Sequence, residues 1–186
     1  FSLIGSLIGL LFVLLLSSCN ELTKVQKSTD LYEKYSYAKK FYNTGKYEWA
    51  AQTLEEILPY FRGSSEMEQA LYLKAQAYYK AKDYVQAQTA FSQYYTEFPN
   101  GEYTELARFY SGYGLAQDIP DPRLDQAKTI AAMQELQLFL DYYPQSEKAE
   151  EAKQLLFSLQ ENLAEKEVLN AKLYYNLGNY IFNNYE

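Results

Sequence analysis

The sequence has 186 residues, of which 48% are hydrophobic, with a net charge of −7 and a mean hydropathy of −0.42, a composition typical of one globular domain. It contains no histidine, which excludes imidazole proton shuttles, Ser-His-Asp or Cys-His nucleophiles and most zinc sites. The acidic balance argues against a nucleic-acid surface, since phosphate contacts need clustered Lys or Arg. We therefore expect no enzyme, no metal site and no cofactor.

The N-terminal segment, residues 1–18, is typical of a secretory signal. Residues 1–16 carry no charge and are almost wholly apolar. As a helix they would span about 24 Å, short of the roughly 30 Å hydrocarbon core, which favours a signal peptide over a transmembrane anchor or a chance core segment. The segment ends in Leu16-Ser17-Ser18-Cys19, which resembles the lipobox of bacterial lipoproteins. The resemblance implies cleavage before Cys19 and attachment of acyl chains such as palmitate to its thiol.

The stretch that follows, residues 19–29, is polar and has no apolar periodicity. It predicts a tether that could reach up to roughly 30 Å from the bilayer surface, at about 3.3 Å per residue. Because Cys19 is the sole cysteine, no disulfide or thiol metal site competes for it. We expect a signal peptide over 1–18, a lipidated cysteine and tether over 19–29, and a folded domain over 30–186.

The folded domain carries a sequence repeat with a period of 37 residues. An alanine is followed three and four residues later by aromatic residues, and a second alanine and a large apolar residue come after a turn. This spacing is typical of tetratricopeptide-type helical hairpins, in which alanines let two helices approach closely. The residues of the first copy and their equivalents in the second are Ala38, Phe41, Tyr42, Tyr47, Ala50 and Leu54, then Ala75, Tyr78, Tyr79, Tyr84, Ala87 and Phe91.

The repeat continues in altered form towards the C-terminus. A shift of 45 residues relates 87–107 to 132–152, and the proline-containing segment 118–123 accounts for about eight additional residues. Turns are predicted at 43–45, 63–65, 99–101 and 144–146, and a last one at Asn176-Leu177-Gly178 because 171–180 repeats 38–47. We predict an all-α fold, an α-solenoid of tetratricopeptide-like hairpins with four complete and a fifth truncated, whose uncovered end frays.

The 21 tyrosines suggest a binding surface, because tyrosine combines an apolar ring with a polar tip. The repeat positions that face the concave groove in tetratricopeptide proteins are Tyr35, Lys39, Tyr42, Tyr72, Gln76 and Tyr79. In the third repeat these positions hold Thr104, Arg108 and Ser111, so the aromatic lining is expected only in the first two repeats. The alternative is that these tyrosines pack in the core.

The lipobox cysteine, the short tether and the hairpins together resemble the BamD (ComL) family, lipoproteins of the outer-membrane β-barrel assembly machinery. The most specific features are an aromatic residue before proline and the helical segment 163–180, with its paired tyrosines: Phe98-Pro99, Tyr143-Pro144 and Tyr174-Tyr175. The resemblance implies a non-catalytic scaffold, lipid-anchored in the outer membrane and facing the periplasm. Its N-terminal repeats would bind unfolded outer-membrane protein precursors.

The same resemblance implies that the C-terminal repeats dock on the barrel-forming BamA subunit, within 163–180. We expect Glu165, Glu167, Lys172 and Tyr175 to take part in this docking. Two other functions remain open on the sequence. Another envelope adaptor lipoprotein, serving a pilus secretin or cell division, would share the anchor and the hairpins. A glycan-binding outer-membrane lipoprotein of the SusD type would explain an aromatic groove, although sugar platforms favour tryptophan and the chain has only Trp49.

Overall fold

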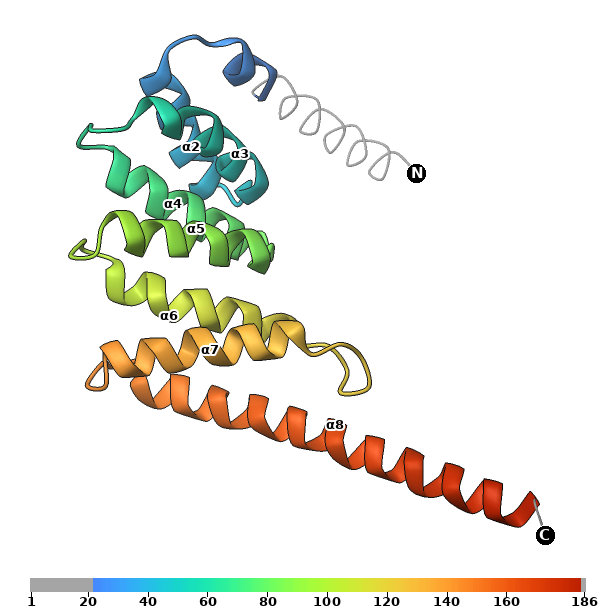
Figure 1. Cartoon of the computed structure of the whole chain (residues 1–186). Helices are drawn as coiled ribbons and strands as arrows, with labels where there is room; N and C mark the ends of the chain where they lie inside the picture. The colour runs from blue at the N-terminus through green and yellow to red at the C-terminus, as the bar shows by residue number, and fades with distance from the viewer. Residues whose placement is uncertain (1–21, 185–186) are drawn as a thin grey trace, which may run out of the picture. The chain divides into compact units, whose positions relative to one another are not determined.

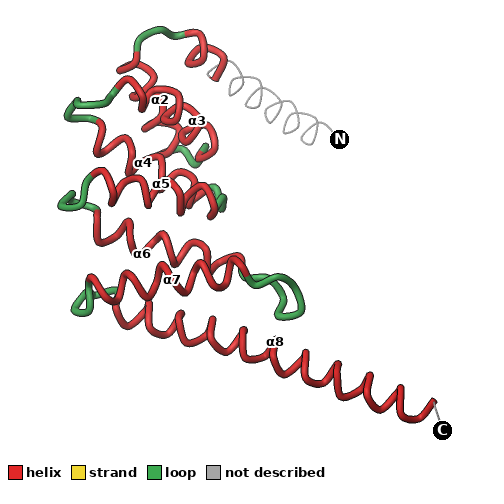
Figure 2. Tube along the Cα trace, in the orientation of Figure 1, coloured by secondary structure: helices red, strands yellow, loops and turns green. Residues whose placement is uncertain are grey.

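The computed structural model of the chain describes residues 22–184. It divides into two compact units, the first ending at Ala81 and the second beginning at Lys82. Every regular element in the described residues is helical, and Figure 2 shows no strand among them. The predicted all-α class is therefore confirmed, and the succession of helices and short turns is that of a tetratricopeptide-like solenoid.

In the first unit, helices pack on their neighbours in chain order: α2 (Leu31–Asn43), α3 (Tyr47–Ile57), the 3-10 turn η1 (Leu58–Tyr60) and α4 (Met67–Lys80) (Figure 1). The carboxylate of Asp30 caps α2 by accepting the N–H groups of Tyr32 and Glu33 at 2.9 and 3.1 Å. Gly45, with φ of +78°, allows the reversal after α2. The alanines of the repeat lie fully buried between the helices, as predicted.

A short helix, residues 22–27, precedes α2. Its Val25 is 1% exposed and packs in a cluster with Phe41, Ala50, Ala51 and Ala77. Residues 22–27 belong to the segment 19–29, which we expected to be a tether. The segment contains two apolar side chains at helical spacing, Leu22 and Val25, and packing them against the first repeat outweighs the entropy of an extended tether. The described part of this segment is therefore a docked helix.

In the second unit, the elements are α5 (Tyr84–Glu97), α6 (Thr104–Leu115), η2 (Ala116–Asp118), α7 (Ala127–Tyr142) and α8 (Ala149–Asn184). Their core contains Phe109, Leu136, Phe139 and Leu159. Helices α6 and α7 approach closely at Gly112, where an added Cβ would lie 2.8 Å from the Leu136 side chain and 2.9 Å from its backbone nitrogen. Only glycine fits at this crossing without a shift of one helix.

The C-terminal element is one continuous helix, α8, in which Asn176 to Gly178 are helical. The predicted turn at this place is wrong, and the chain does not form the separate fifth hairpin that the turn was expected to begin. The similarity of 171–180 to 38–47 was misleading because the turn after α2 relies on the positive φ of Gly45. A single glycine costs about 1 kcal/mol relative to alanine inside a helix, which is too little to end the helix.

Candidate functional site

Two of the expected groove tyrosines are packing residues. Tyr35 on α2 and Tyr72 on α4 are only 6% and 7% exposed. The ring of Tyr35 meets that of Phe61 edge to face, with 5.5 Å between centroids. Burial, together with the nearby charge of Glu66, raises the pKa of the Tyr35 phenol. These rings stabilise the first unit and leave little surface for a ligand.

The other four expected groove residues lie at the surface where α2 and α4 meet. The hydroxyl of Tyr42 donates to Oε1 of Gln76 at 3.1 Å, which bridges the two helices. Lys39 is exposed and its Nζ lies 4.4 Å from the centroid of the Tyr35 ring. Tyr79 is half-buried and follows Gln76 by three residues on the same helical face. We call Lys39, Tyr42, Gln76 and Tyr79 the α2–α4 surface.

In the second unit, Arg108 of α6 is clamped between two tyrosine rings. The guanidinium carbon lies 4.2 Å from the ring centroid of Tyr95 on α5 and 4.1 Å from that of Tyr142 on α7. Aromatic rings thus surround this groove position in the third repeat, contrary to our expectation. The two other groove positions of the third repeat, Thr104 and Ser111, are buried and line no surface.

The repeat pattern could not identify these two rings. The shift of 45 residues places Tyr95 opposite Leu140, so Tyr95 and Tyr142 are not equivalent positions of the repeat. They meet Arg108 only because three helices converge there. The available signal for these two rings was that each belongs to a pair of adjacent tyrosines, 94–95 and 142–143. Adjacent residues on a helix point in different directions, so only one member of each pair can occupy the packing position.

The carboxylate of Glu135 holds this cluster in place from α7. It accepts hydrogen bonds from Gln88 at 3.0 Å and from the hydroxyl of Tyr95 at 3.2 Å, both on α5. Burial raises the pKa of the Tyr95 phenol. Among the described residues, none accepts a hydrogen bond from the Arg108 guanidinium, which lies between the two rings. A stacked guanidinium of this kind suits a carboxylate ligand.

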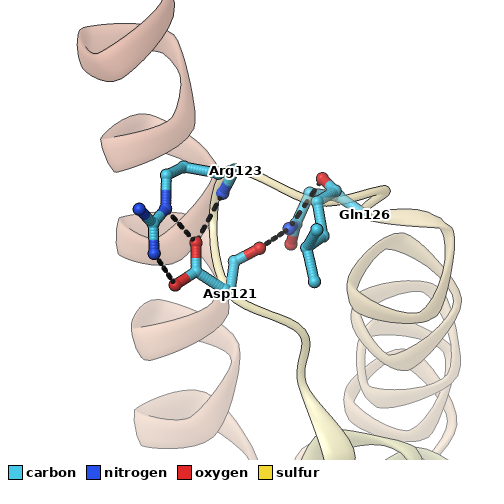
Figure 3. A network of polar contacts seen from close by, with 4 residues as sticks. Asp121, Arg123 and Gln126 are labelled. Carbon is cyan, nitrogen blue, oxygen red and sulfur yellow. Dashed lines mark hydrogen bonds and ion pairs between the residues drawn. The ribbon is translucent and has the colours of Figure 1, made fainter.

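The inserted segment between α6 and α7 is an ordered loop. The carboxylate of Asp121 accepts the backbone N–H of Arg123 at 2.9 Å and two guanidinium N–H groups at 2.8 Å (Figure 3). These contacts hold the pKa of Asp121 well below its usual range. The buried side chain of Gln126 donates to the carbonyl oxygens of Asp121 and Leu124 at 2.9 and 3.2 Å. Gln126 therefore fixes the loop from inside.

The same loop supports α8. Nζ of Lys166 donates to the carbonyl oxygen of Leu124 at 2.9 Å. The contact lies beyond the part of α8 that packs on α7, where Ala152 and Leu159 are fully buried. The insertion therefore gives α8 a second point of attachment. The sequence alone indicated only that about eight additional residues precede the next helix.

Beyond this contact, the packed face of α8 continues without cover from the described residues. Lys166, Leu173 and Leu177 follow Leu159 at 7, 14 and 18 residues, which keeps them on one face of the helix. Leu173 is 56% exposed and Leu177 is 47% exposed. We call Leu173 and Leu177 the open α8 face. An apolar face that is buried in one half of a helix and open in the other half indicates a surface for a partner.

The four expected docking residues are all exposed, but they do not form the open α8 face. Glu165, Lys172 and Tyr175 share another side of the helix, and Tyr175 lies opposite Lys166. Glu167 points to a third side. All four residues are accessible to a partner, and their docking role stays a prediction. Which side of α8 carries exposed apolar area depends on where α7 ceases to cover the helix.

Two expected features of the membrane anchor, the signal peptide 1–18 and the lipidation site Cys19, lie outside the described residues. Within residues 22–184, no helix combines the length and apolar character needed to span a bilayer. The same residues contain no cluster of Cys, Asp or Glu that could hold a metal ion.

Comparison with protein families gives a match over nearly the whole chain. The YfiO family, described as an outer membrane lipoprotein, matches residues 26–183. Comparison with individual curated proteins gave no match. The matched range includes the α2–α4 surface, the Arg108 cluster, the ordered insertion and the open α8 face. The chain therefore belongs to the YfiO family of outer membrane lipoproteins, the BamD family that its sequence resembles.

Proposed function

We propose that this protein is a non-catalytic scaffold of the outer-membrane β-barrel assembly machinery, anchored through acylated Cys19 and facing the periplasm. The observation that carries the proposal is the family match over 26–183, which includes α2 to α7 completely and α8 up to residue 183. The function needs two kinds of surface, one for unfolded barrel precursors and one for the BamA-like subunit. The two units offer candidates for both.

The α2–α4 surface is our candidate for precursor binding. Tyr42 and Tyr79 offer half-buried rings, and Gln76 and Lys39 offer hydrogen-bond donors beside them. An extended peptide rich in aromatic residues can stack on the rings and use the amide and ammonium groups for its backbone carbonyls. In the second unit, the clamped Arg108 supplies a donor for a carboxylate of the same class of ligand.

The open α8 face is our candidate for docking on the BamA-like subunit. Leu173 and Leu177 are about half exposed, so covering both completely would contribute roughly 2–3 kcal/mol of hydrophobic free energy. Glu165, Lys172 and Tyr175 would then border the contact and select the partner by charge and hydrogen bonding. The Lys166 contact with the insertion holds the helix in position before the partner arrives.

The first experiment is detergent extraction of the full-length protein from cell envelopes and mass spectrometry of what travels with it. We expect a large outer-membrane β-barrel subunit with periplasmic domains to be recovered with the protein. The variant Leu173→Glu should no longer recover this subunit. Leu138→Glu, on an exposed position of α7 with 45% exposure, is the matched control and should retain the partner. Recovery of a secretin, or of no protein, would contradict the proposal and favour another adaptor role.

Precursor binding is tested separately by site-specific photo-crosslinking in living cells. A photoreactive residue at Lys39 should crosslink to newly synthesised barrel precursors, whereas one at Lys153, also exposed and on α8, should not. Equal crosslinking at both positions would show that the α2–α4 surface has no special role.

A further inference from the structure

The charge of the chain is distributed very unevenly. Residues 22–46 contain six lysines and only two acidic residues, Asp30 and Glu33, whereas residues 47–186 contain 11 Lys or Arg and 21 Asp or Glu. A basic N-terminal end on an acidic protein indicates an anionic partner for that end. Lys34 does not contribute to such a surface, because it is buried and paired with Glu56.

Several of the remaining lysines gather over aromatic rings on one side of the first unit. Lys24 and Lys40 place their ammonium groups 5.9 and 5.8 Å from the centroid of the same ring, that of Tyr37. Lys46 lies 4.9 Å from the ring of Trp49. Both rings pack on the cluster that contains Val25, so helix 22–27, α2 and the start of α3 present them together. We call Lys24, Tyr37, Lys40, Lys46 and Trp49 the basic aromatic face.

This composition is that of a membrane interface. Tyrosine and tryptophan combine an apolar ring with a polar edge, and lysine keeps its stem on apolar surface while its ammonium reaches anionic headgroups. A lysine near an anionic leaflet contributes about fivefold to binding, which corresponds to about 1 kcal/mol. Lys27 adds a further exposed charge one turn after Lys24.

The docked helix also limits how far the face can lie from an anchor at Cys19. Only three peptide steps separate Cys19 from Leu22, so the two Cα atoms are at most about 11 Å apart. Since helix 22–27 is fixed to the first unit through Val25, an acylated Cys19 would hold this unit close to the bilayer surface.

We propose that the basic aromatic face rests on anionic phospholipid headgroups beside the lipid anchor, and so sets the orientation of the first unit on the membrane. The inference depends on the proposed function in one respect, the acylation of Cys19. It adds a second, electrostatic contact that a flexible tether would not provide, and two signals together give stable and oriented attachment.

The test uses Trp49, the only tryptophan of the chain, as the reporter. The full-length lipidated protein is reconstituted in vesicles of phosphatidylcholine, or of phosphatidylcholine mixed with phosphatidylglycerol, that carry a dansyl headgroup acceptor. We expect stronger energy transfer from Trp49 in the mixed vesicles than in pure phosphatidylcholine, where the anchor holds the first unit near the bilayer without fixing which side faces it. The transfer should fall to the phosphatidylcholine level at about 1 M salt, where the Debye length is about 3 Å.

The double variant Lys24→Glu and Lys27→Glu should lose the extra transfer, since two charge reversals remove at least about 25-fold in affinity for the anionic surface. The control, Lys82→Glu with Lys153→Glu, makes the same charge change on exposed positions of the second unit and should behave as the unaltered protein. Equal transfer in both kinds of vesicle, or equal effects of the two double variants, would overturn the proposal. Flotation with pure phosphatidylcholine vesicles reports acylation independently, so a missing anchor is recognised as such.

Discussion

The crossing of α6 and α7 at Gly112 provides a quantitative test of the packing in the second unit. In Gly112→Ala, the new Cβ would lie 2.8 Å from Cγ and 2.9 Å from the backbone nitrogen of Leu136. Carbon atoms in good contact are about 3.5–4.0 Å apart, so the clash amounts to roughly 0.5–1 Å. One of the two contacts is to backbone, and therefore a change of rotamer cannot relieve it and the helices must separate.

Such overpacking costs about 1–3 kcal/mol, and the better helix propensity of alanine returns up to about 1 kcal/mol. We expect Gly112→Ala to destabilise the second unit by about 1–2 kcal/mol net. Urea unfolding followed by circular dichroism gives the change, and amide exchange in α7 locates it. Because the adjacent Glu135 holds the Tyr95 hydroxyl, the displacement should also loosen the Arg108 cluster.

Gly178→Ala is the matched control with the opposite expected sign. An added Cβ at Gly178 meets nothing within 4 Å, and the residue is helical, so alanine should increase the helicity of the end of α8. If Gly112→Ala were as stable as the unaltered protein, the close approach of α6 and α7 would be refuted. If Gly178→Ala lowered helicity, a turn at this position would have to be reconsidered.

Two further predictions concern polar contacts. Tyr42→Phe should destabilise the first unit by about 0.5–1.5 kcal/mol in chemical unfolding, because Gln76 loses its donor, whereas Tyr60→Phe, on an exposed ring, should change little. The Asp121 carboxyl should stay ionised below the ordinary aspartate range in an NMR titration, because its pKa is lowered by Arg123. Its contribution to loop order is therefore present at neutral pH and lost only as the pH falls through the lowered pKa, and Arg123→Gln should raise the midpoint towards the ordinary range, although the backbone N–H at 123 remains.

The sequence predicted the repeat and its packing positions well. Ala38, Ala75, Ala107 and Ala152, identified from spacing alone, are all fully buried. Close helix approach requires a small residue at a fixed place in each repeat, and such a requirement leaves a periodic trace in the sequence. The predicted lipidation of Cys19 and the roles of the groove and docking residues stay predictions, because none of the described contacts tests them.

The surroundings that the sequence did not predict have a common cause, since each depends on neighbours that are distant in the sequence. Tyr35 and Tyr72 occupy groove positions of the repeat, yet the surrounding residues cover both. Arg108 acquires its two rings from α5 and α7, at positions that are not equivalent in the repeat. Val25 gave too short a periodic signal to recognise, because only one other apolar residue, Leu22, shares its helix at helical spacing.

The sequence by itself determined the helical class, the register of the repeats and the uneven charge, because these follow from residue type and local spacing. Tertiary structure alone decided which faces are covered and which remain open. Leu159 and Leu173 are both leucines on the same side of α8, but only Leu159 is covered by α7. The physical difference between a core position and a candidate binding surface is therefore the place where the neighbouring helix ends.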